Sequence, residues 1–253
     1  MRFDYLPLAA FAALMLACGG ERGAEEASVA TESREAPAAE SPASAAVALL
    51  QPGTLSGWHA YGGGAPGAAW SVDPEGVLHF DPSITGDDGE TLGGDIVTDA
   101  AYDDYELELE WRIGPCGNSG IIYNVIERDD LAYPWLSGPE MQVLDDSCHP
   151  DAKIYTHRAG DLYDMIAGDS TAVKPAGQWN AVRLVVTDGH VEHWLNGRKV
   201  VEYDNTGDAW RERIADSKFA DFGEQFGSVT GGHIALQDHG DPVWYRGVRV
   251  RSL

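Results

Sequence analysis

The sequence is poor in basic residues. Its 253 residues include 17 Lys and Arg against 41 Asp and Glu, a formal net charge of −24 at pH 7. Because nucleic-acid phosphates select basic surfaces, this balance argues against nucleic-acid binding. The glycine fingerprint of a dinucleotide-binding fold is also missing, so we expect no nucleotide cofactor. The surplus of carboxylates favours solubility and attracts divalent cations.

The sequence also lacks an apolar run of the length that a transmembrane helix needs. The run at residues 6–20, LPLAAFAALMLACGG, has the shape of a secretory signal. Its end is similar to the bacterial lipobox, in which a cysteine is lipidated after cleavage. We therefore expect residues 1–18 to be a lipoprotein signal peptide. The exported protein would be anchored through Cys18 to a membrane, in the periplasm or at the cell surface.

Residues 19–46 lack aromatic side chains and are rich in Ala, Glu, Ser and Pro. Such a segment buries too little apolar surface to order itself, which predicts a disordered tether. The folded domain then covers residues 47–253. Cysteine is scarce, and Cys116 and Cys148 are the two that this domain contains. No zinc-like spacing is present, and an oxidising compartment favours a disulfide between them, with two unlinked thiols as the alternative.

The folded part shows no convincing long helical period, and one short helix is expected within residues 208–219. Short runs of Val, Ile, Tyr and Trp alternate instead with Gly, Asp, Asn and Pro turns. This pattern favours an all-β fold, a two-sheet sandwich or jelly roll. The clearest strands are expected at 70–80, 105–113, 120–126, 138–144, 179–187, 190–203, 233–238 and 243–253, with tight hairpin turns at 187–189 and 195–199.

One strand alternates carboxylates with apolar residues: Glu106, Glu108 and Glu110 share a face of YELELEWRI. Paired carboxylates are typical of a retaining glycosidase, whose two carboxyls lie about 5–5.5 Å apart. The same alternation is typical of any half-buried strand with one solvated face. We favour that second interpretation for this strand.

A second strand, in GPEMQVLDDSCHP at 138–150, mixes polar and apolar residues in a different way. Glu140 and Gln142 share one face, and Asp145 and His149 follow where the strand ends. Glu140, Asp145 and His149 offer the oxygen and nitrogen atoms that calcium, manganese or zinc would accept. An exposed edge followed by a turn is the alternative.

Other strands repeat the polar pattern. Gln237 and His239 share a face near the end of one strand, where a solvated histidine is the alternative to a catalytic one. Glu192 and Trp194 share a face of VEHWLNG, a combination that suits a sugar ring and its hydroxyls.

These segments, in this order, resemble the 3-keto-disaccharide hydrolase domain family from about residue 50 to the C-terminus. The likeness is carried by GW (57–58), GGDIVTDAAYDDYELELEWRI (93–113), GNSGIIYN (117–124), GPEMQVLDD (138–146), AGDLYDMIA (159–167), KPAGQWNAVRLVV (174–186), VEHWLNGRKVVEYD (191–204), SKF (217–219) and GHIALQDHGDPVWYRGVRVR (232–251). The sequence departs from the family pattern at Cys116, where glycine is expected, and at Tyr123-Asn124.

The resemblance implies a concanavalin A-like jelly roll that cleaves sugars already oxidised at C3. The ketone acidifies the C2 hydrogen, a base removes it, and the glycosidic oxygen leaves from C1 before water adds. A divalent cation, calcium, manganese or zinc, could stabilise the enolate. A separate sugar 3-dehydrogenase would have to make the oxidised substrate.

The resemblance also suggests roles for the polar strand residues. His149 or His239 is the expected base, and Glu140 the expected acid or metal ligand, with Asp145 beside it. Substrate contacts are expected from Asn118, Tyr123, Gln142, Lys174, Glu192, Trp194 and Gln237. The competing functions are a non-catalytic carbohydrate-binding module, an ordinary glycosidase that uses the YELELEW glutamates, and a lipid-anchored interaction protein.

Overall fold

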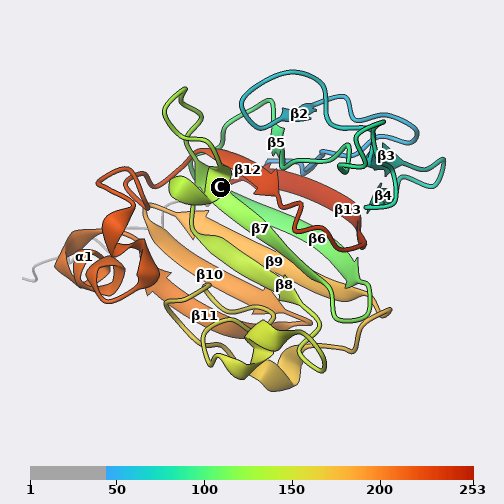
Figure 1. Ribbon diagram of the computed structural model, residues 1–253. Helices are drawn as coiled ribbons and strands as arrows, with labels where there is room; N and C mark the ends of the chain where they lie inside the picture. The colour runs from blue at the N-terminus through green and yellow to red at the C-terminus, as the bar shows by residue number, and fades with distance from the viewer. Residues whose placement is uncertain (1–43) are drawn as a thin grey trace, which may run out of the picture. The chain divides into compact units, whose positions relative to one another are not determined.

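Two antiparallel sheets lie face to face in the computed structural model, which describes residues 44–253 (Figure 1). This is the all-β, two-sheet sandwich that the strand pattern predicts. The expected signal peptide, the lipidated Cys18 and residues 19–43 of the expected tether lie outside the described residues. Within the described part, none of the helices has the length and apolar character needed to span a bilayer.

The larger sheet has eight strands, and we call it the large sheet. Its long central strands alternate between core and solvent, so one face packs inward and the other faces out. In order across the sheet the strands are β11 (Arg198–Asp204), β10 (His190–Leu195), β9 (Asn180–Thr187), β6 (Tyr105–Ile113), β13 (Val243–Ser252), β4 (Leu78–Phe80) and β3 (Trp70–Val72), with β1 (Val47–Ala48) paired to β13.

The second sheet, called the small sheet, has five strands and lies in front of the large sheet in Figure 1. Helix α1 (Gly207–Ala215) and the 3₁₀ turns η1 (Pro134–Leu136), η2 (Pro150–Lys153), η3 (Ser170–Ala172) and η4 (Lys218–Asp221) lie in the connections. The strands of the small sheet, in order, are β2 (Trp58–Ala60), β5 (Ile96–Thr98), β12 (His233–Leu236), β7 (Asn118–Val125) and β8 (Glu140–Leu144).

The small sheet is buried on both faces at its β7 and β8 end. Met141 and Val143 point into the main core between the sheets. Ile122 and Ala235 point the other way, into a smaller apolar cluster against which Trp135 packs. Loops therefore cover part of the outer face of this sheet, and polar residues on that face are shielded from bulk water.

Several expected elements have different bounds in the structure. The expected strand at 70–80 is two strands, β3 and β4, because Asp73 and Gly76 form a turn in which the Asp73 carboxylate accepts the Val77 N–H at 2.8 Å. Residues 190–203 form the hairpin β10–β11 with the tight turn expected at 195–199, and the expected helix is α1 followed by η4. Strands β2 and β5 were not expected.

A disulfide joins Cys116 and Cys148, the pairing expected from the sequence, with their Cα atoms 4.7 Å apart. It links the turn before β7 to the loop after β8. The Asp145 carboxylate supports the same turn by accepting the Cys116 N–H at 2.8 Å. Two neighbouring strand ends are thereby held together at one edge of the small sheet.

Candidate active site

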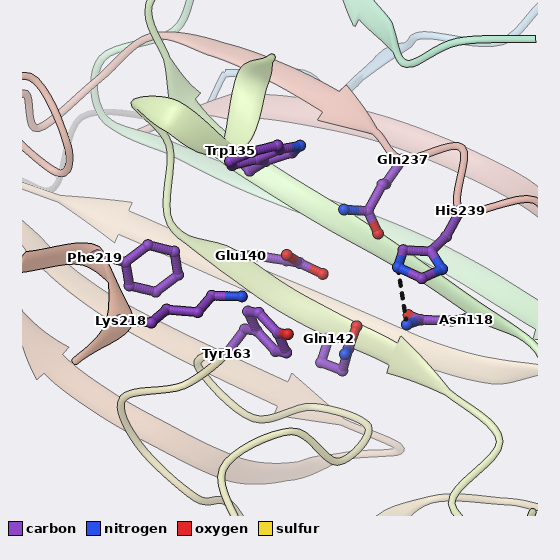
Figure 2. A pocket seen from close by; sticks show the side chains of 9 residues that line it. All are labelled: Asn118, Trp135, Glu140, Gln142, Tyr163, Lys218, Phe219, Gln237 and His239. Carbon is purple, nitrogen blue, oxygen red and sulfur yellow. Dashed lines mark hydrogen bonds between the residues drawn. The ribbon is translucent and has the colours of Figure 1, made fainter. Parts of the chain in front are cut away.

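A pocket of about 240 Å³ lies on the outer face of the small sheet. Figure 2 shows that its floor comes from strands β7 and β8 and the end of β12, while loops supply its walls. The residues that line it are Asn118, Trp135, Glu140, Gln142, Tyr163, Lys218, Phe219, Gln237 and His239. Five of these were expected from the sequence as site residues: Asn118, Glu140, Gln142, Gln237 and His239.

The floor follows from strand alternation. Glu140 and Gln142 sit two apart on β8, so both side chains point away from the core. The Glu140 side chain lies over Gly120 on β7, where a Cβ atom would collide with its carboxylate. Glycine at position 120 therefore makes the space that the carboxyl group occupies, and Glu140 is 7% exposed.

Glu140 and Lys218 give the pocket two ionisable groups that face each other across its floor (Figure 2), and Glu140 is the buried one. Burial raises the pKa of the Glu140 carboxyl to about 8, an effect that the nearby Lys218 charge only partly offsets. Burial likewise lowers the pKa of the Lys218 ammonium, against the pull of Glu140. Desolvation thus brings the Glu140 carboxyl toward proton exchange near neutral pH, and it weakens the hold of Lys218 on its proton.

Amide groups add open hydrogen-bonding atoms. Among the described residues, the side-chain carbonyl oxygens of Asn118 and Gln237 are buried without a hydrogen-bond partner. The Asn118 Nδ2 lies 3.4 Å from His239 Nε2, and the Asn118 N–H donates to Asp241 at 3.0 Å. Buried acceptors without partners cost free energy unless a ligand satisfies them, which suits the hydroxyl groups of a sugar.

Aromatic walls complete the pocket. Trp135 comes from η1, Tyr163 from the loop after η2, and Phe219 from η4. The Lys218 ammonium lies 3.9 Å from the centre of the Tyr163 ring, a cation–π contact. Sequence reasoning missed these three aromatic residues and Lys218. The segments AGDLYDMIA and SKF carried the family resemblance and held Tyr163, Lys218 and Phe219, whereas Trp135 gave no such signal.

His149 and Asp145 lie beside the pocket rather than in it. The His149 ring centre is 6.4 Å from that of His239, and its Nδ1 accepts the Asp151 N–H at 3.2 Å. The Asp145 carboxylate accepts the backbone N–H of Cys116 and of Ser147, as well as the Ser147 hydroxyl. The expectation of a catalytic Asp145 does not fit this arrangement, because the carboxylate is used to cap a loop.

The expected substrate contact of Tyr123 is wrong. The residue alternates onto the core face of β7 and is fully buried. Its hydroxyl group bonds to the Tyr203 hydroxyl at 2.6 Å and to His193 Nε2 at 2.8 Å. Burial lowers the pKa of His193 to about 4, so this is a neutral core network between the sheets.

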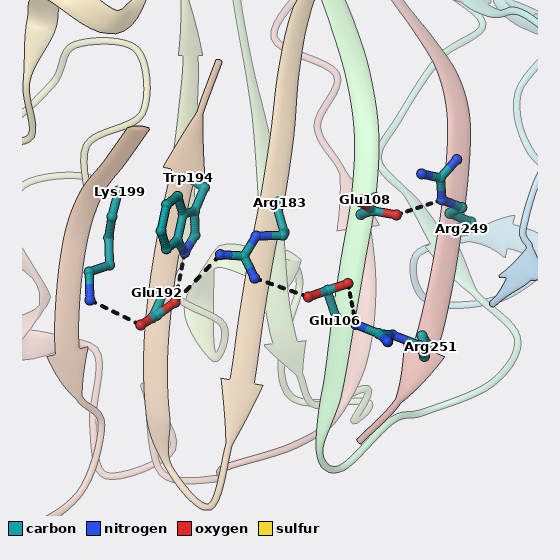
Figure 3. Close-up of polar contacts among 8 residues, drawn as sticks. All are labelled: Glu106, Glu108, Arg183, Glu192, Trp194, Lys199, Arg249 and Arg251. Atoms are coloured by element: carbon teal, nitrogen blue, oxygen red, sulfur yellow. Dashed lines mark hydrogen bonds and ion pairs between the residues drawn. The ribbon is translucent and has the colours of Figure 1, made fainter. Parts of the chain in front are cut away.

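The residues Glu192, Trp194 and Lys174, expected as substrate contacts, lie away from this pocket. Glu192 and Trp194 lie on the outer face of the large sheet, where Glu192 accepts hydrogen bonds from Trp194 Nε1 at 2.7 Å and Lys199 at 3.0 Å (Figure 3). Lys174 is exposed, and its ammonium group donates a hydrogen bond to the Trp179 carbonyl at 3.0 Å. None of the three lines the pocket.

The glutamates of the YELELEW strand lie on that same outer face. Glu106, Glu108 and Glu110 accept hydrogen bonds from one arginine each on β13, at 2.6–2.7 Å. Glu106 also accepts from Arg183 at 3.1 Å. We call the chain of contacts Lys199–Glu192–Arg183–Glu106–Arg251 the outer ladder (Figure 3). These carboxylates hold strands together, as the half-buried-strand interpretation predicts.

The metal ligands expected at Glu140, Asp145 and His149 do not fit a resident ion. In residues 44–253 two groups of three donors have atoms within 4.8 Å of one another, and neither is this trio. One group is Asp145 with the two disulfide-bonded cysteines, whose thiols are not free. The other is His190, Glu192 and Glu202, on the large sheet, where Lys199 already pairs with both glutamates.

The fold has counterparts in known proteins. The family model described as a 3-keto-alpha-glucoside-1,2-lyase-like domain matches residues 46–251. The chain belongs to this family. A 3-keto-disaccharide hydrolase of Bacteroides thetaiotaomicron is 34% identical over 220 residues, which cover 79% of this chain and 76% of the relative. By homology, this member of the lyase-like family is therefore a glycoside-hydrolase-like enzyme.

Solved structures agree with this family assignment. A candidate glycosyl hydrolase from Parabacteroides distasonis superposes with a TM-score of 0.73 at 30% identity, covering 82% of this chain and 94% of that one. A second one from the same organism shares the fold with a TM-score of 0.57 at 24% identity, over 78% of this chain and 99% of its own. The resemblance found in the sequence is thus confirmed at the level of the family.

Proposed function

We propose that the pocket on the small sheet binds the oxidised ring of a 3-keto-glucoside or 3-keto-disaccharide and cleaves its glycosidic bond. The observation that supports this most is the buried Glu140, which faces Lys218 within a pocket otherwise lined by amides, aromatic rings and His239. The name of the Bacteroides relative refers to the same class of substrate.

The chemistry needs three kinds of group. A base takes the C2 proton, which the C3 ketone acidifies, and the electrons move onto the C3 oxygen. Donors must stabilise that enolate oxygen while the glycosidic oxygen leaves from C1. Water then adds across the new double bond, so that the net reaction is hydrolysis.

Glu140 and Lys218 are the enolate-stabilising groups in this proposal. With a pKa of about 8, the Glu140 carboxyl is mostly protonated at neutral pH and can donate a hydrogen bond to the C3 oxygen. The Lys218 ammonium supplies positive charge at the same floor. Few water molecules compete at Glu140, because its side chain is buried, and the hydrogen bond that it donates is correspondingly strong.

His239 is the preferred base, and His149 is the second candidate. His239 Nε2 lies 3.4 Å from Asn118 Nδ2 at the pocket, and in the tautomer with its proton on Nδ1 this nitrogen offers a lone pair there. Imidazole is the side chain most often used for proton abstraction near neutral pH. Comparing His239→Ala with His149→Ala separates the two assignments, since each variant removes one ring.

Gln142, Gln237 and Asn118 are proposed to bind the sugar hydroxyls, and the aromatic walls to pack against the ring. A divalent cation remains a prediction, and no step is assigned to it because the expected ligands do not converge. Addition of EDTA to the assay tests that prediction: an unchanged rate would remove the cation from the mechanism.

The deciding experiment compares 4-nitrophenyl 3-keto-α-glucoside with the unoxidised glucoside. We expect nitrophenol release from the keto substrate alone, and solvent deuterium at C2 of the sugar. Glu140→Gln should lower kcat about 100-fold or more, the usual size of an acid–base contribution. Glu108→Gln is the matched control. It changes a carboxylate that pairs with Arg249 on the outer face of the large sheet, away from the pocket, and it should keep full activity. Cleavage of the unoxidised glucoside, or of neither substrate by a folded protein, would contradict the proposal.

A further inference from the structure

A second hollow adjoins the pocket at its β12 end. It measures about 370 Å³ and shares Trp135, Gln237 and His239 with the pocket. Its other lining residues are Ala60, Tyr61, Gly93, Gly94, Asp95, Ala132, Tyr133 and Asp238. Because three side chains border both spaces, the two hollows are neighbours, as the two halves of a disaccharide would require.

Asp95 brings a carboxyl group to this hollow from the residue before β5. Its Oδ1 accepts the Asp238 N–H at 2.8 Å, and its backbone carbonyl accepts the Tyr61 N–H at 2.9 Å. These bonds fix the carboxyl group at the wall of the hollow. Burial raises the pKa of Asp95 to about 7, with the Asp238 charge adding to the rise.

The neighbouring Asp238 has a different environment. Its two carboxylate oxygens accept backbone N–H groups, from Gly94 at 2.7 Å and from Gly240 at 2.8 Å. Asp95 lies in surroundings that disfavour its charged form, as is typical of a carboxyl group that acts as a general acid. Asp95 is therefore the member of the pair that can hold a proton to donate.

An aromatic surface faces the same hollow. Tyr133 is 51% exposed and stacks on Trp135, with ring centres 4.9 Å apart and planes inclined by 8°. Trp135 also borders the main pocket, so the stacked pair extends outward from it. Exposed aromatic faces of this kind pack well against the apolar face of a sugar ring.

We propose that this hollow is the leaving-group subsite: it takes a second sugar or another alcohol against the Tyr133–Trp135 stack, and Asp95 protonates the departing glycosidic oxygen. This inference rests on the function proposed above and extends it to the other half of the substrate. It also favours a disaccharide over a simple methyl glycoside.

The step balances as an elimination without redox change. The base takes the C2 proton, and a C1–C2 double bond forms as the C1–O bond breaks. The electron pair of that bond goes to the glycosidic oxygen, which takes the Asp95 proton and leaves as an alcohol. The proton held by the base returns to Asp95 through solvent before the next turnover.

Leaving groups of different acidity test the role of Asp95. Nitrophenolate leaves readily without protonation, whereas a sugar alkoxide does not. Asp95→Asn keeps an oxygen that can accept the Asp238 N–H. We expect it to lower kcat/KM about 100-fold on a 3-keto-disaccharide but only a few-fold on 4-nitrophenyl 3-keto-α-glucoside. Asp99→Asn, at the other end of β5, is the control. It should leave kcat/KM unchanged on both substrates.

Tyr133→Ala tests the aromatic surface with a variant whose exposed position spares the fold. We expect KM for the disaccharide to rise up to about 10-fold, with KM for methyl 3-keto-α-glucoside unchanged.

The outcomes separate the two proposals. Equal losses on both substrates in Asp95→Asn, or full activity on both, would overturn the leaving-group role while leaving the proposed function intact. If the wild-type enzyme cleaves neither keto substrate, the proposed function fails and the subsite with it.

Discussion

Glu140 is a carboxyl group whose ionisation the fold opposes. Its pKa rises from 4.5 to about 8, so its contribution to stability is fully present below pH 4.5 and is lost as the pH rises through 8. Glu140→Gln keeps the shape and removes the titration. We expect the variant to gain stability relative to wild type between pH 5 and pH 9, by roughly a few kcal/mol. Thermal unfolding at the two pH values measures this gain.

Glu108→Gln is again the control, because its carboxylate pairs with Arg249 on the outer face. Between pH 5 and pH 9, the Glu108→Gln variant should not gain stability relative to wild type as Glu140→Gln does. A Glu140→Gln effect that is constant from pH 5 to pH 9 would show that Glu140 titrates normally in the folded protein.

Single residues also show how far the sequence could reach. Strand alternation predicted that Glu140 and Gln142 share a face, and the structure places both in the pocket. The same reasoning failed for Glu192 and Trp194, because a polar and aromatic strand face looks alike on either sheet. Alternation says which residues are turned away from the core, but the sheet to which a strand belongs depends on long-range pairing. Lys218 was missed for the related reason that its loop reaches the pocket only through tertiary packing.

At the scale of elements, long strands were predictable and short ones were not. Strand β6 has the bounds that alternation predicts, Tyr105–Ile113, because nine residues show the period several times. Strands β2 and β5 have three residues each and cannot show it. These short strands matter to the proposed function, since Asp95 immediately precedes β5.

The disulfide is an element-scale restraint with a testable effect. It closes a loop of sequence separation 32 and holds the turn before Asn118 against the loop that carries His149. Reduction should lower the free energy of unfolding by ~2–4 kcal/mol, chiefly by freeing the unfolded chain. Urea unfolding of the oxidised and reduced protein measures the change. We also expect kcat to fall on reduction in native buffer, because Asn118 then loses its support. Identical unfolding midpoints would contradict this role.

At the scale of the whole molecule, the two outward sheet faces have different tasks. The small sheet carries a shielded pocket with groups that change protonation near neutral pH. The large sheet carries the outer ladder, in which acidic residues meet basic ones in a chain that is poor in bases overall. The acidic composition predicted neither arrangement, since pairing depends on which strands become neighbours. Catalysis and stability should therefore respond to changes on different faces.

Glu106→Gln tests this division, because Glu106 bridges Arg183 and Arg251 and its side chain is only 12% exposed. We expect the free energy of unfolding to fall by ~1–2 kcal/mol, since two arginines lose their partner at a partly shielded site. The loss should shrink in about 0.5 M salt, where charge interactions are screened. The value of kcat/KM on a 3-keto-glucoside should stay at the wild-type level.

Glu108→Gln is the control, because Glu108 has one arginine partner and a more exposed side chain. Its free energy of unfolding should fall by less than that of Glu106→Gln. A large fall in activity without loss of stability would mean that the outer face of the large sheet takes part in the reaction after all.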